Sequence, residues 1–556
     1  MEILLGVSAF VGVRLALVSD AFAVEGGVLA ALTLIIVCVV SIGRVPRAAH
    51  LCDAATLPSL VAVHALASSA SAAPWLRLQL RCSLCCCAAA VLAAACRWNE
   101  RSVAAATAGG SVAVAALVWW GPEHAADTAA RSAAAATLSL AAAAALRRAL
   151  PGSFSLGEAS LMAQVASLLL LNAGAAASPG AAGAAPPSDA DTLVALLRCG
   201  VSATIAACAA LSAAGVLWHL RTRSAPPIAP YLAACAALFT GMILPWCAQA
   251  LPPRAAAEGE GEDAPLVALA MRPLPPLAWI YRFLRRDRVA AAIVAYWLAT
   301  LPAALWLIGR IRRSGALRRI EVRKLFHALA LLLFVPALIA RPHFLALAYG
   351  VALCVGLLVE CTRALRVAQL GDTIEAYMRQ FTDDRDDAGA GAITTHLYLL
   401  IGCAAPLWLH VGLGGGGQRW AGGAGGVAQL LPMCGLLAIG VGDAAAAIVG
   451  NRLARTHRWR PHSGRSVEGS LAMLLSMVVA GGAALGAISL TSDAALVGSE
   501  VVAAALGGAE EGYGLGRGAG VAAALLTTTL LEALTDQIDN LVIPLHAYAA
   551  LALAVW

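Results

Sequence analysis

Long apolar runs constrain this chain more than any other feature of its sequence. Stretches of about 20 residues with almost no charge recur along it, separated by short polar segments. A stretch of that length can cross the hydrocarbon core of a bilayer as a helix, which satisfies its own backbone hydrogen bonds. Hydrophobic residues make up 60% of the 556 residues and charged residues only 13%, which excludes a soluble domain of this size. The sequence predicts an all-α, polytopic integral membrane protein with roughly 13–17 transmembrane helices.

Polar residues divide the chain into two parts. Residues 1–309 are repeated apolar spans with little chemistry, which we interpret as an N-terminal transmembrane helix array. In residues 310–556 the polar residues become organised, and we interpret this part as a catalytic transmembrane domain. Its spans are predicted at about 325–342, 343–363, 392–411, 429–450, 468–490 and 518–533, with a last one from Leu541.

Basic loops predict which side of the membrane the polar segments face. Short loops rich in arginine stay in the cytosol, so segments 310–324 and 452–465 are both expected there. Four predicted spans separate them, an even number, so the two assignments agree. Segments 363–395 and 534–540 then also face the cytosol. The basic stretch 282–288 disagrees, because one span separates it from Arg310; either it lies in the interface or the span count there is wrong.

A carboxylate interrupts the apolar run AIGVGDAAAAIVGN. On a helix, Gly440, Asp443, Ala447 and Gly450 share one face, which is nearly bare apart from the carboxylate. Such a face lets a backbone or a ligand approach closely. The alternative is a packing seam of small residues with Asp443 paired to an arginine. An ionisable residue within a span is costly, which favours a functional role.

The loop behind that run carries five arginines and leads into Ser466-Val467-Glu468-Gly469-Ser470. Most of these arginines fit an ordinary cytosolic loop. The serine, however, is expected to open a helix, whose free N–H groups and positive dipole end favour an anion. Arg465 adds a guanidinium group suited to phosphate, and Glu468 a carboxylate suited to a metal. Carboxylate, Mg²⁺ and phosphate together indicate nucleotide chemistry, although the chain has no P-loop or protein-kinase signature.

Lys324 is the only lysine among the 38 lysines and arginines of the chain. It lies in EVRKLFH, where Arg323, Lys324 and His327 can face one place at helical spacing. A snorkelling basic helix end is the alternative, but arginine would serve that purpose equally well.

Two acidic clusters fall on the same predicted side. In LLEALTDQIDNLVIPL, Glu532, Asp536 and Asp539 recur at i, i+4 and i+7, which predicts one helical face at a membrane boundary. We favour a metal or general-base role for them over a structural one. FTDDRDDAGAGAITTH, residues 381–396, has four aspartates, and a solvated charge run explains it equally well.

Several of these segments together resemble the dolichol kinase family of CTP-dependent polyprenol kinases. The resemblance covers roughly residues 322–545 and includes VRKLFH, LLVECTRALRV, FTDDRDDAG, VGDAAAAIVGN, RSVEGS and LLEALTDQIDNLVIPL, in the same order. The first 300 or so residues match only as hydrophobic spans. The stretch at about 443–470 corresponds to the CTP-binding region of the family.

The resemblance implies a set of site residues. The CTP-binding positions are Asp443, Ala447, Gly450, Arg465, Ser466, Glu468 and Gly469. Ala454 replaces a glycine that is common in the family, and Gly464-Arg465-Ser466 replaces a more basic run, which puts the exact phosphate contacts in doubt. The residues expected to take part in catalysis are Asp443, Lys324, His327, Asp539 and Glu532. Asp443 and Glu468 are the first candidates for binding Mg²⁺ or another divalent cation.

The resemblance also implies the reaction and its location. The γ-phosphate of CTP would pass to the hydroxyl of dolichol, making dolichyl phosphate for protein glycosylation at the endoplasmic reticulum. The CTP site would face the cytosol, the lipid tail would stay in the bilayer, and no nucleic acid is expected. Asp539 or Asp443 would orient or deprotonate the hydroxyl, and Lys324 or Arg323 would neutralise charge on the transferring group.

Three other functions compete with this one. Another CTP-using lipid enzyme could share these motifs: a phytol or diacylglycerol kinase, or a cytidylyltransferase acting on phosphatidate. An ion-coupled transporter could line its path with Asp443, Glu532 and Asp539, but the sequence shows no inverted repeat. A structural membrane subunit would not need its carboxylates clustered on one side of the bilayer.

Overall fold

The computed structural model describes residues 29–30, 61–62, 80–84, 86–88, 134–144, 159–165, 188–252, 274–379, 393, 395–413, 426–453, 457–459, 464–491, 514–535 and 539–555. Over these residues the secondary structure is helical, with one isolated β-bridge between Arg458 and Ser466. Six of the described helices are long and apolar enough to cross a membrane. The prediction of an all-α polytopic membrane protein is therefore confirmed. The total of 13–17 spans falls largely on residues outside the described ranges and stays a prediction.

The chain forms two compact units that alternate along the sequence. One unit comprises Met1–Leu168, Lys324–Leu331 and Ile401–Trp556, and the other comprises Leu169–Arg323 and Leu332–Leu400. Helices α14 (Arg319–Ala340) and α18 (Thr395–Leu413) each contribute residues to both. The predicted division at residue 309 concerns function and stays a prediction.

The unit built mainly from residues 169–400 contains helices of very different lengths. These are α8 (Asp189–Thr222), α9 (Ile228–Leu238), η4 (Phe239–Ile243), α10 (Leu244–Ala248), α12 (Pro275–Arg286), α13 (Arg288–Ser314), α15 (Pro342–Ala364) and α16 (Leu370–Met378). Asp287 starts α13 by accepting hydrogen bonds from the amides of Val289 and Ala290, and Gly315, at φ +67°, ends it.

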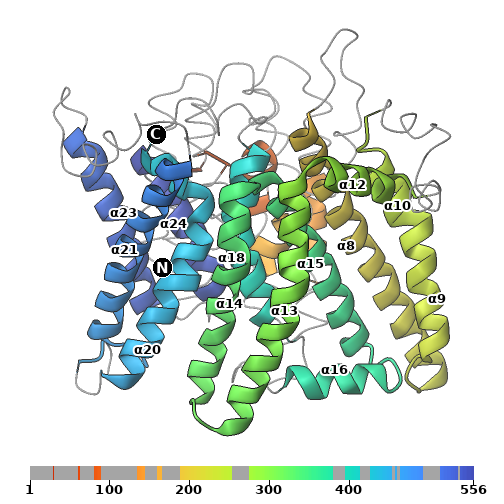
Figure 1. The fold of residues 1–556 in the computed structure, drawn as a ribbon. Helices are drawn as coiled ribbons and strands as arrows, with labels where there is room; N and C mark the ends of the chain where they lie inside the picture. The colour runs from red at the N-terminus through yellow and green to blue at the C-terminus, as the bar shows by residue number, and fades with distance from the viewer. Residues whose placement is uncertain are drawn as a thin grey trace. The chain divides into compact units, whose positions relative to one another are not determined.

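The basic stretch 282–288 lies where α12 ends and α13 begins. Helix α12 has 12 residues, which span only about 18 Å, too short to cross a bilayer. This geometry favours the interfacial interpretation of that stretch. Figure 1 shows the turn between α13 and α14 at the same end of this unit as α16, which fits the prediction that segments 310–324 and 363–395 face one side.

The end of α15 carries a buried ion-pair network in the same unit. Arg363 donates to Glu360 at 2.6 Å and 2.8 Å and also pairs with Glu375 of α16. Glu360 accepts a hydrogen bond from the amide of Ile393 at 2.9 Å. The network therefore ties together α15, α16 and Ile393, at either end of segment 380–392, which lies outside the described residues.

The other unit holds the helices with the predicted site residues. They are the Lys324–Leu331 part of α14, α18 from Ile401, η6 (Gly426–Met433), η7 (Leu436–Asp443), α20 (Ala444–Arg452), α21 (Val467–Thr491), α23 (Gly514–Leu534) and α24 (Asp539–Val555). Their bounds agree with the predicted spans to within a few residues at most ends. Helix α21 packs against η7, α20 and α23, and α24 packs against α23, η6 and η7.

Small residues let these helices approach closely. A Cβ at Gly402 of α18 would overlap the backbone oxygen of Asn540, and one at Gly435 would overlap the backbone oxygen of Gly402. Met473 and Met477 of α21 fill the space beside Gly442 and pack with Ala438 and Ile543. The backbone around Asp443 and the start of α24 is thus fixed by dense packing.

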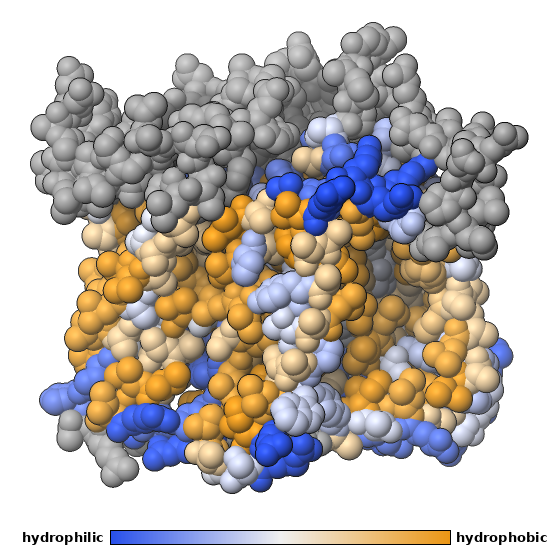
Figure 2. Space-filling model, in the orientation of Figure 1, coloured by the Kyte–Doolittle hydropathy of each residue, from blue (hydrophilic) through white to orange (hydrophobic). Residues whose placement is uncertain are grey.

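Apolar side chains cover the outer sides of the helices. Figure 2 shows them over the middle of the helices on the face in view, with hydrophilic side chains near the helix ends. Among the exposed large residues, Leu298, Val479 and Leu220 are each at least 70% exposed, at 73%, 72% and 70%. An exposed apolar surface of this kind suits contact with lipid tails.

Candidate functional site

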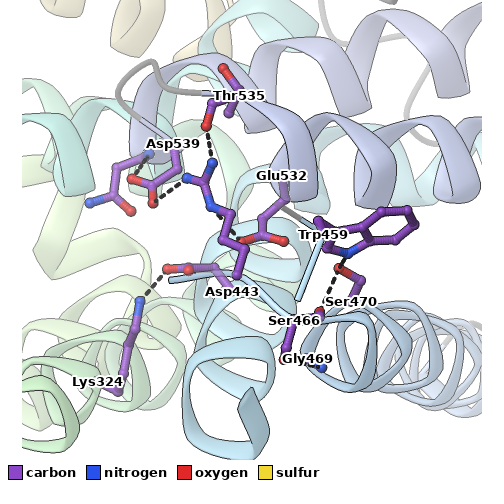
Figure 3. Close-up of polar contacts among 11 residues, drawn as sticks. Lys324, Asp443, Trp459, Ser466, Gly469, Ser470, Glu532, Thr535 and Asp539 are labelled. Atoms are coloured by element: carbon purple, nitrogen blue, oxygen red, sulfur yellow. Dashed lines mark hydrogen bonds and ion pairs between the residues drawn. The ribbon is translucent and has the colours of Figure 1, made fainter. Parts of the chain in front are cut away.

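The buried pair of Lys324 and Asp443 lies at the centre of the predicted site. Lys324 Nζ donates to Asp443 Oδ2 at 2.5 Å, and both side chains are almost enclosed, at 12% and 8% exposed. Figure 3 shows the lysine reaching the carboxylate from α14, with Glu532 and Asp539 nearby. The structure thus joins the only lysine of the chain to the carboxylate that interrupts the apolar run AIGVGDAAAAIVGN. The alternative partner considered for Asp443, an arginine, is replaced by Lys324.

His327 lies one helical turn after Lys324 and faces the same segment. Its Nδ1 is 3.0 Å from the carbonyl oxygen of Ile439 and 3.5 Å from Asp443 Oδ2. The carbonyl can only accept, so this contact requires a proton on Nδ1. Ile439 and Asp443 belong to the π-helical segment η7, a wide turn that often occurs at functional sites. Lys324 and His327 therefore hold one carboxylate and one carbonyl of η7.

Arg465 is the second cation of the site. Its Nε lies 3.2 Å from Glu532 Oε1, and its Nη2 lies 3.7 Å from Asp539 Oδ2. Its Nη1 donates to the backbone oxygen of Thr535. The guanidinium group thus joins the loop before α21 to the end of α23 and the start of α24. Glu532 is buried, whereas the Asp539 side chain is 37% exposed.

The prediction that Glu532, Asp536 and Asp539 share one helical face is wrong. Helix α23 ends at Leu534 and α24 begins at Asp539, so a helix break separates Glu532 from Asp539. Asp536 lies outside the described residues. Arg465 nevertheless contacts both Glu532 and Asp539.

The helix predicted to open at Ser466 is present. Ser466 Oγ accepts a hydrogen bond from the amide of Gly469 at 3.1 Å, which caps α21. The loop is held against this turn, because Trp459 Nε1 donates to Ser470 Oγ at 2.9 Å and Trp459 N donates to Arg465 O at 3.3 Å. The positive end of the α21 dipole therefore lies beside Arg465, as the phosphate prediction requires. Residues 454–456 and 460–463 of this loop lie outside the described residues.

The two predicted glycines of the CTP-binding stretch face each other where α20 crosses α21. A Cβ at Gly469 would lie 2.9 Å from the oxygen of Ala446 and 3.5 Å from the Cα of Gly450. Gly440 faces Leu331 of α14 instead. Close helix packing therefore explains why both positions are glycine. Ala447 is partly exposed on α20. A nucleotide contact at any of these positions stays a prediction.

Glu468 and Asp443 are held by different partners. Its Oε1 is 2.7 Å from His457 Nδ1, whereas Asp443 is bound by Lys324 and His327. Its Oε2 is buried and makes no hydrogen bond. Among the described residues, no group of three or more His, Cys, Asp and Glu side chains is arranged to hold a metal.

Comparison with known sequences relates this chain to dolichol kinases. The chain is 32% identical over 280 residues to the dolichol kinase EVAN of Arabidopsis thaliana, which covers 50% of this chain and 43% of that protein. It is 31% identical over 278 residues to the dolichol kinase of Homo sapiens, covering 49% and 46%. It is 33% identical over 214 residues to the dolichol kinase sec59 of Schizosaccharomyces pombe, covering 36% and 40%.

These relatives are all dolichol kinases, and the matches support an assignment to that family. The chain spans a little under half the length of the curated relatives it matches. No protein-family model matches the chain, and no solved structure matches it. The resemblance predicted from the motifs is therefore confirmed at the level of the family.

The structure adds residues that the motifs of the dolichol kinase family did not single out. The backbone oxygen of Thr535 accepts a hydrogen bond from Arg465, a contact that the residue type at this position does not indicate. Trp459 and Ser470 anchor the loop, and a tryptophan in an arginine-rich loop was the available signal. Arg323, considered as an alternative to Lys324, belongs to the other of the two units, and its role stays a prediction.

Proposed function

We propose that this chain is a CTP-dependent dolichol kinase of the endoplasmic reticulum membrane. It would transfer the γ-phosphate of CTP to the hydroxyl of dolichol and so supply dolichyl phosphate for protein glycosylation. The observation that carries the proposal is the pair of cations, Lys324 and Arg465, set among Asp443, Glu532 and Asp539 in a chain related to dolichol kinases. Phosphoryl transfer depends mainly on positioning and on charge of this kind.

CTP would bind where the loop before α21 meets the site. Ser466 and Gly469 form the first turn of α21, whose positive end favours a phosphate group. The forked guanidinium of Arg465 suits phosphate oxygens, which would exchange with its carboxylate contacts when the nucleotide binds. This geometry supports the predicted CTP-binding stretch 443–470, with its cytosolic orientation following from the basic loop.

The donor set is compatible with Mg²⁺. This ion takes oxygen ligands and is commonly held by one or two carboxylates together with substrate phosphates, so a closed protein cage is not needed. Asp443 and Glu468 are the predicted ligands, and the free Oε2 of Glu468 suits that role. Glu532 and Asp539 supply two further carboxylates beside Arg465. A bound Mg²⁺ would neutralise charge on the phosphate oxygens.

The chain's own residues would divide the remaining work. The dolichol oxygen attacks the γ-phosphorus, a new oxygen–phosphorus bond forms, the bond to the β-phosphate oxygen breaks, and CDP leaves. The hydroxyl proton passes to a carboxylate. Asp539 suits this role because, of the three carboxylates, it lies farthest from its cation, at 3.7 Å from Arg465. Asp443, in contrast, lies 2.5 Å from Lys324. Lys324 would balance charge on the transferring group, with His327 keeping η7 in place.

Phosphate transfer by the purified full chain in detergent tests this function. The donors are γ-labelled CTP and ATP, and the acceptors are dolichol, phytol and diacylglycerol. We expect label in dolichyl phosphate from CTP, lost in Asp443→Asn and retained in Asp372→Asn, whose carboxylate is exposed on α16. Label in another lipid would keep the site and change the substrate. Folded protein that transfers label from neither donor would overturn the proposal in favour of transport.

A further inference from the structure

Asn540 is a buried polar residue whose side-chain oxygen makes no hydrogen bond. The residue is 7% exposed, and its Oδ1 is buried without a hydrogen bond. The hydrogen bond described for this residue outside the helix ladder is made by its backbone, since Asn540 N donates to Asp539 Oδ1 at 2.8 Å. Most buried polar atoms in proteins are paired, because an unpaired one is costly. A buried oxygen that accepts no hydrogen bond, next to a candidate general base, indicates a position where a ligand could donate one.

The backbone at Asn540 is fixed, so the residue cannot turn away to find a partner. A Cβ at Gly402 of α18 would overlap the backbone oxygen of Asn540, and Ile439 of η7 packs at the same glycine. Asn540 is also the second residue of α24, next to Asp539, which lies near Arg465. Tight helix contacts therefore fix the residue with the unpaired Oδ1 directly next to Asp539 of the charged cluster.

The chemistry of the surroundings selects the ligand. A carboxamide has one acceptor oxygen and one donor nitrogen and carries no charge, so it matches a hydroxyl group, which also donates and accepts. A phosphate would bring negative charge against Asp539 and Glu532 and offers no proton to Oδ1 at neutral pH. A hydroxyl at the end of an apolar lipid enters a buried place without the cost of a charge.

We propose that Asn540 binds the hydroxyl group of the lipid alcohol acceptor, an inference that rests on the proposed kinase function. Its Oδ1 accepts a hydrogen bond from the hydroxyl group and leaves the lone pairs of the hydroxyl oxygen for the phosphorus. As the new oxygen–phosphorus bond forms and CDP leaves, the hydroxyl proton passes from the lipid oxygen to the carboxylate of the neighbouring Asp539. Asn540 thus distinguishes an alcohol from other lipid end groups.

Binding without nucleotide tests this proposal separately from catalysis. The full chain in detergent is titrated with a polyprenol and with the same hydrocarbon lacking its hydroxyl. We expect the wild type to bind the alcohol about tenfold to a hundredfold more tightly, as one hydrogen bond to a buried group allows. In Asn540→Leu, which keeps the size but not the amide, this preference should vanish. Thr528→Val removes a satisfied buried hydroxyl on α23 and should retain it.

Thermal unfolding of the same variants separates a ligand site from a structural role. Since the buried Oδ1 of Asn540 makes no hydrogen bond, Asn540→Leu should unfold at the wild-type temperature or above it. A clear fall in that temperature, or a full preference for the alcohol in Asn540→Leu, would overturn the proposal. So would a wild type that binds alcohol and hydrocarbon equally, even where phosphate transfer to dolichol is observed. Absence of transfer with a preserved alcohol preference would instead overturn the kinase function alone.

Discussion

The ammonium group of Lys324 lies 2.5 Å from a carboxylate oxygen of Asp443, although 119 residues separate them in the chain. Each is buried, and each would be a costly unpaired charge without the other. The pair also fixes α14 against η7 through two residues predicted to take part in catalysis. Loss of either residue is therefore expected to act on both stability and phosphate transfer.

Lys324→Met should destabilise the protein by about 3–5 kcal/mol, because Asp443 is left as a buried carboxylate without its cation. Phosphate transfer should fall by at least about a hundredfold, since a charge at the transferring group is lost. The double variant Lys324→Met/Asp443→Asn removes both charges and should recover most of the stability but none of the activity. Thermal unfolding and label transfer, measured on the two single variants and the double variant, give the coupling. Additive losses of stability would contradict the pairing.

Arg465→Lys should impair phosphate transfer although it keeps the positive charge. The guanidinium group reaches Glu532, Asp539 and the backbone oxygen of Thr535 at once, and a lysine ammonium cannot match that fork. We expect a loss of about tenfold to a thousandfold in kcat/KM for CTP. Arg458→Lys, an exposed position in the same loop, is the matched control. If neither substitution impaired transfer, the loop would act only through its net charge, which both substitutions keep.

The sequence alone was sufficient for the spans and for most of the charged residues of the site. Intramembrane charges and a single lysine are local signals, so Asp443, Lys324 and Arg465 could be singled out without a fold. Which cation meets which carboxylate depends on helix packing, so the pairing of Lys324 with Asp443 could not be predicted. The face of Glu532 and Asp539 was predicted wrongly because α23 ends at Leu534, before Asp539 is reached, so the helical periodicity does not continue.

Other features leave no signal in the pattern of residue types. The π-helical segment η7 reads as an ordinary apolar run, and the partner of Arg465 at Thr535 is a backbone oxygen. Asn540 lies within the stretch LLEALTDQIDNLVIPL but has no feature in the sequence that sets it apart, because the missing hydrogen bond of its Oδ1 is visible only once burial is known. Sequence reasoning finds the residues that carry charge and misses those whose role depends on the geometry of the backbone.

Gly469→Ala should destabilise the crossing of α20 and α21. The new methyl group would lie 2.9 Å from the oxygen of Ala446 and 3.2 Å from Ser466 Oγ, so the helices must separate or the cap must shift. We expect a loss of about 1–3 kcal/mol, as for other overpacked positions, with weaker CTP binding because the cap lies at the phosphate site. Gly464→Ala meets nothing within 4 Å and should unfold like the wild type. Thermal unfolding with and without CTP measures both effects, and a neutral Gly469→Ala would contradict this packing.

The attachment of α16 should depend on pH through Glu375. Burial raises the pKa of this carboxyl, but its ion pairs with Arg363 and Arg379 outweigh burial and hold the pKa below its ordinary value of 4.5. A carboxyl with a lowered pKa in the folded state stabilises that state above its unfolded pKa, and the contribution is lost as the pH falls through the lowered value. Protection of α16 amides from hydrogen exchange, corrected for the intrinsic effect of pH, should therefore fall below about pH 4.5.

The same experiment on variants identifies the group responsible. Glu375→Gln cannot titrate, so its α16 amides should exchange faster than those of the wild type at pH 7 and show little further change on acidification. Asp372→Asn, an exposed acid on the same helix, should keep the wild-type dependence on pH. If Glu375→Gln retained that dependence, Glu375 would not be the titrating group and this explanation of the acid loss would be wrong.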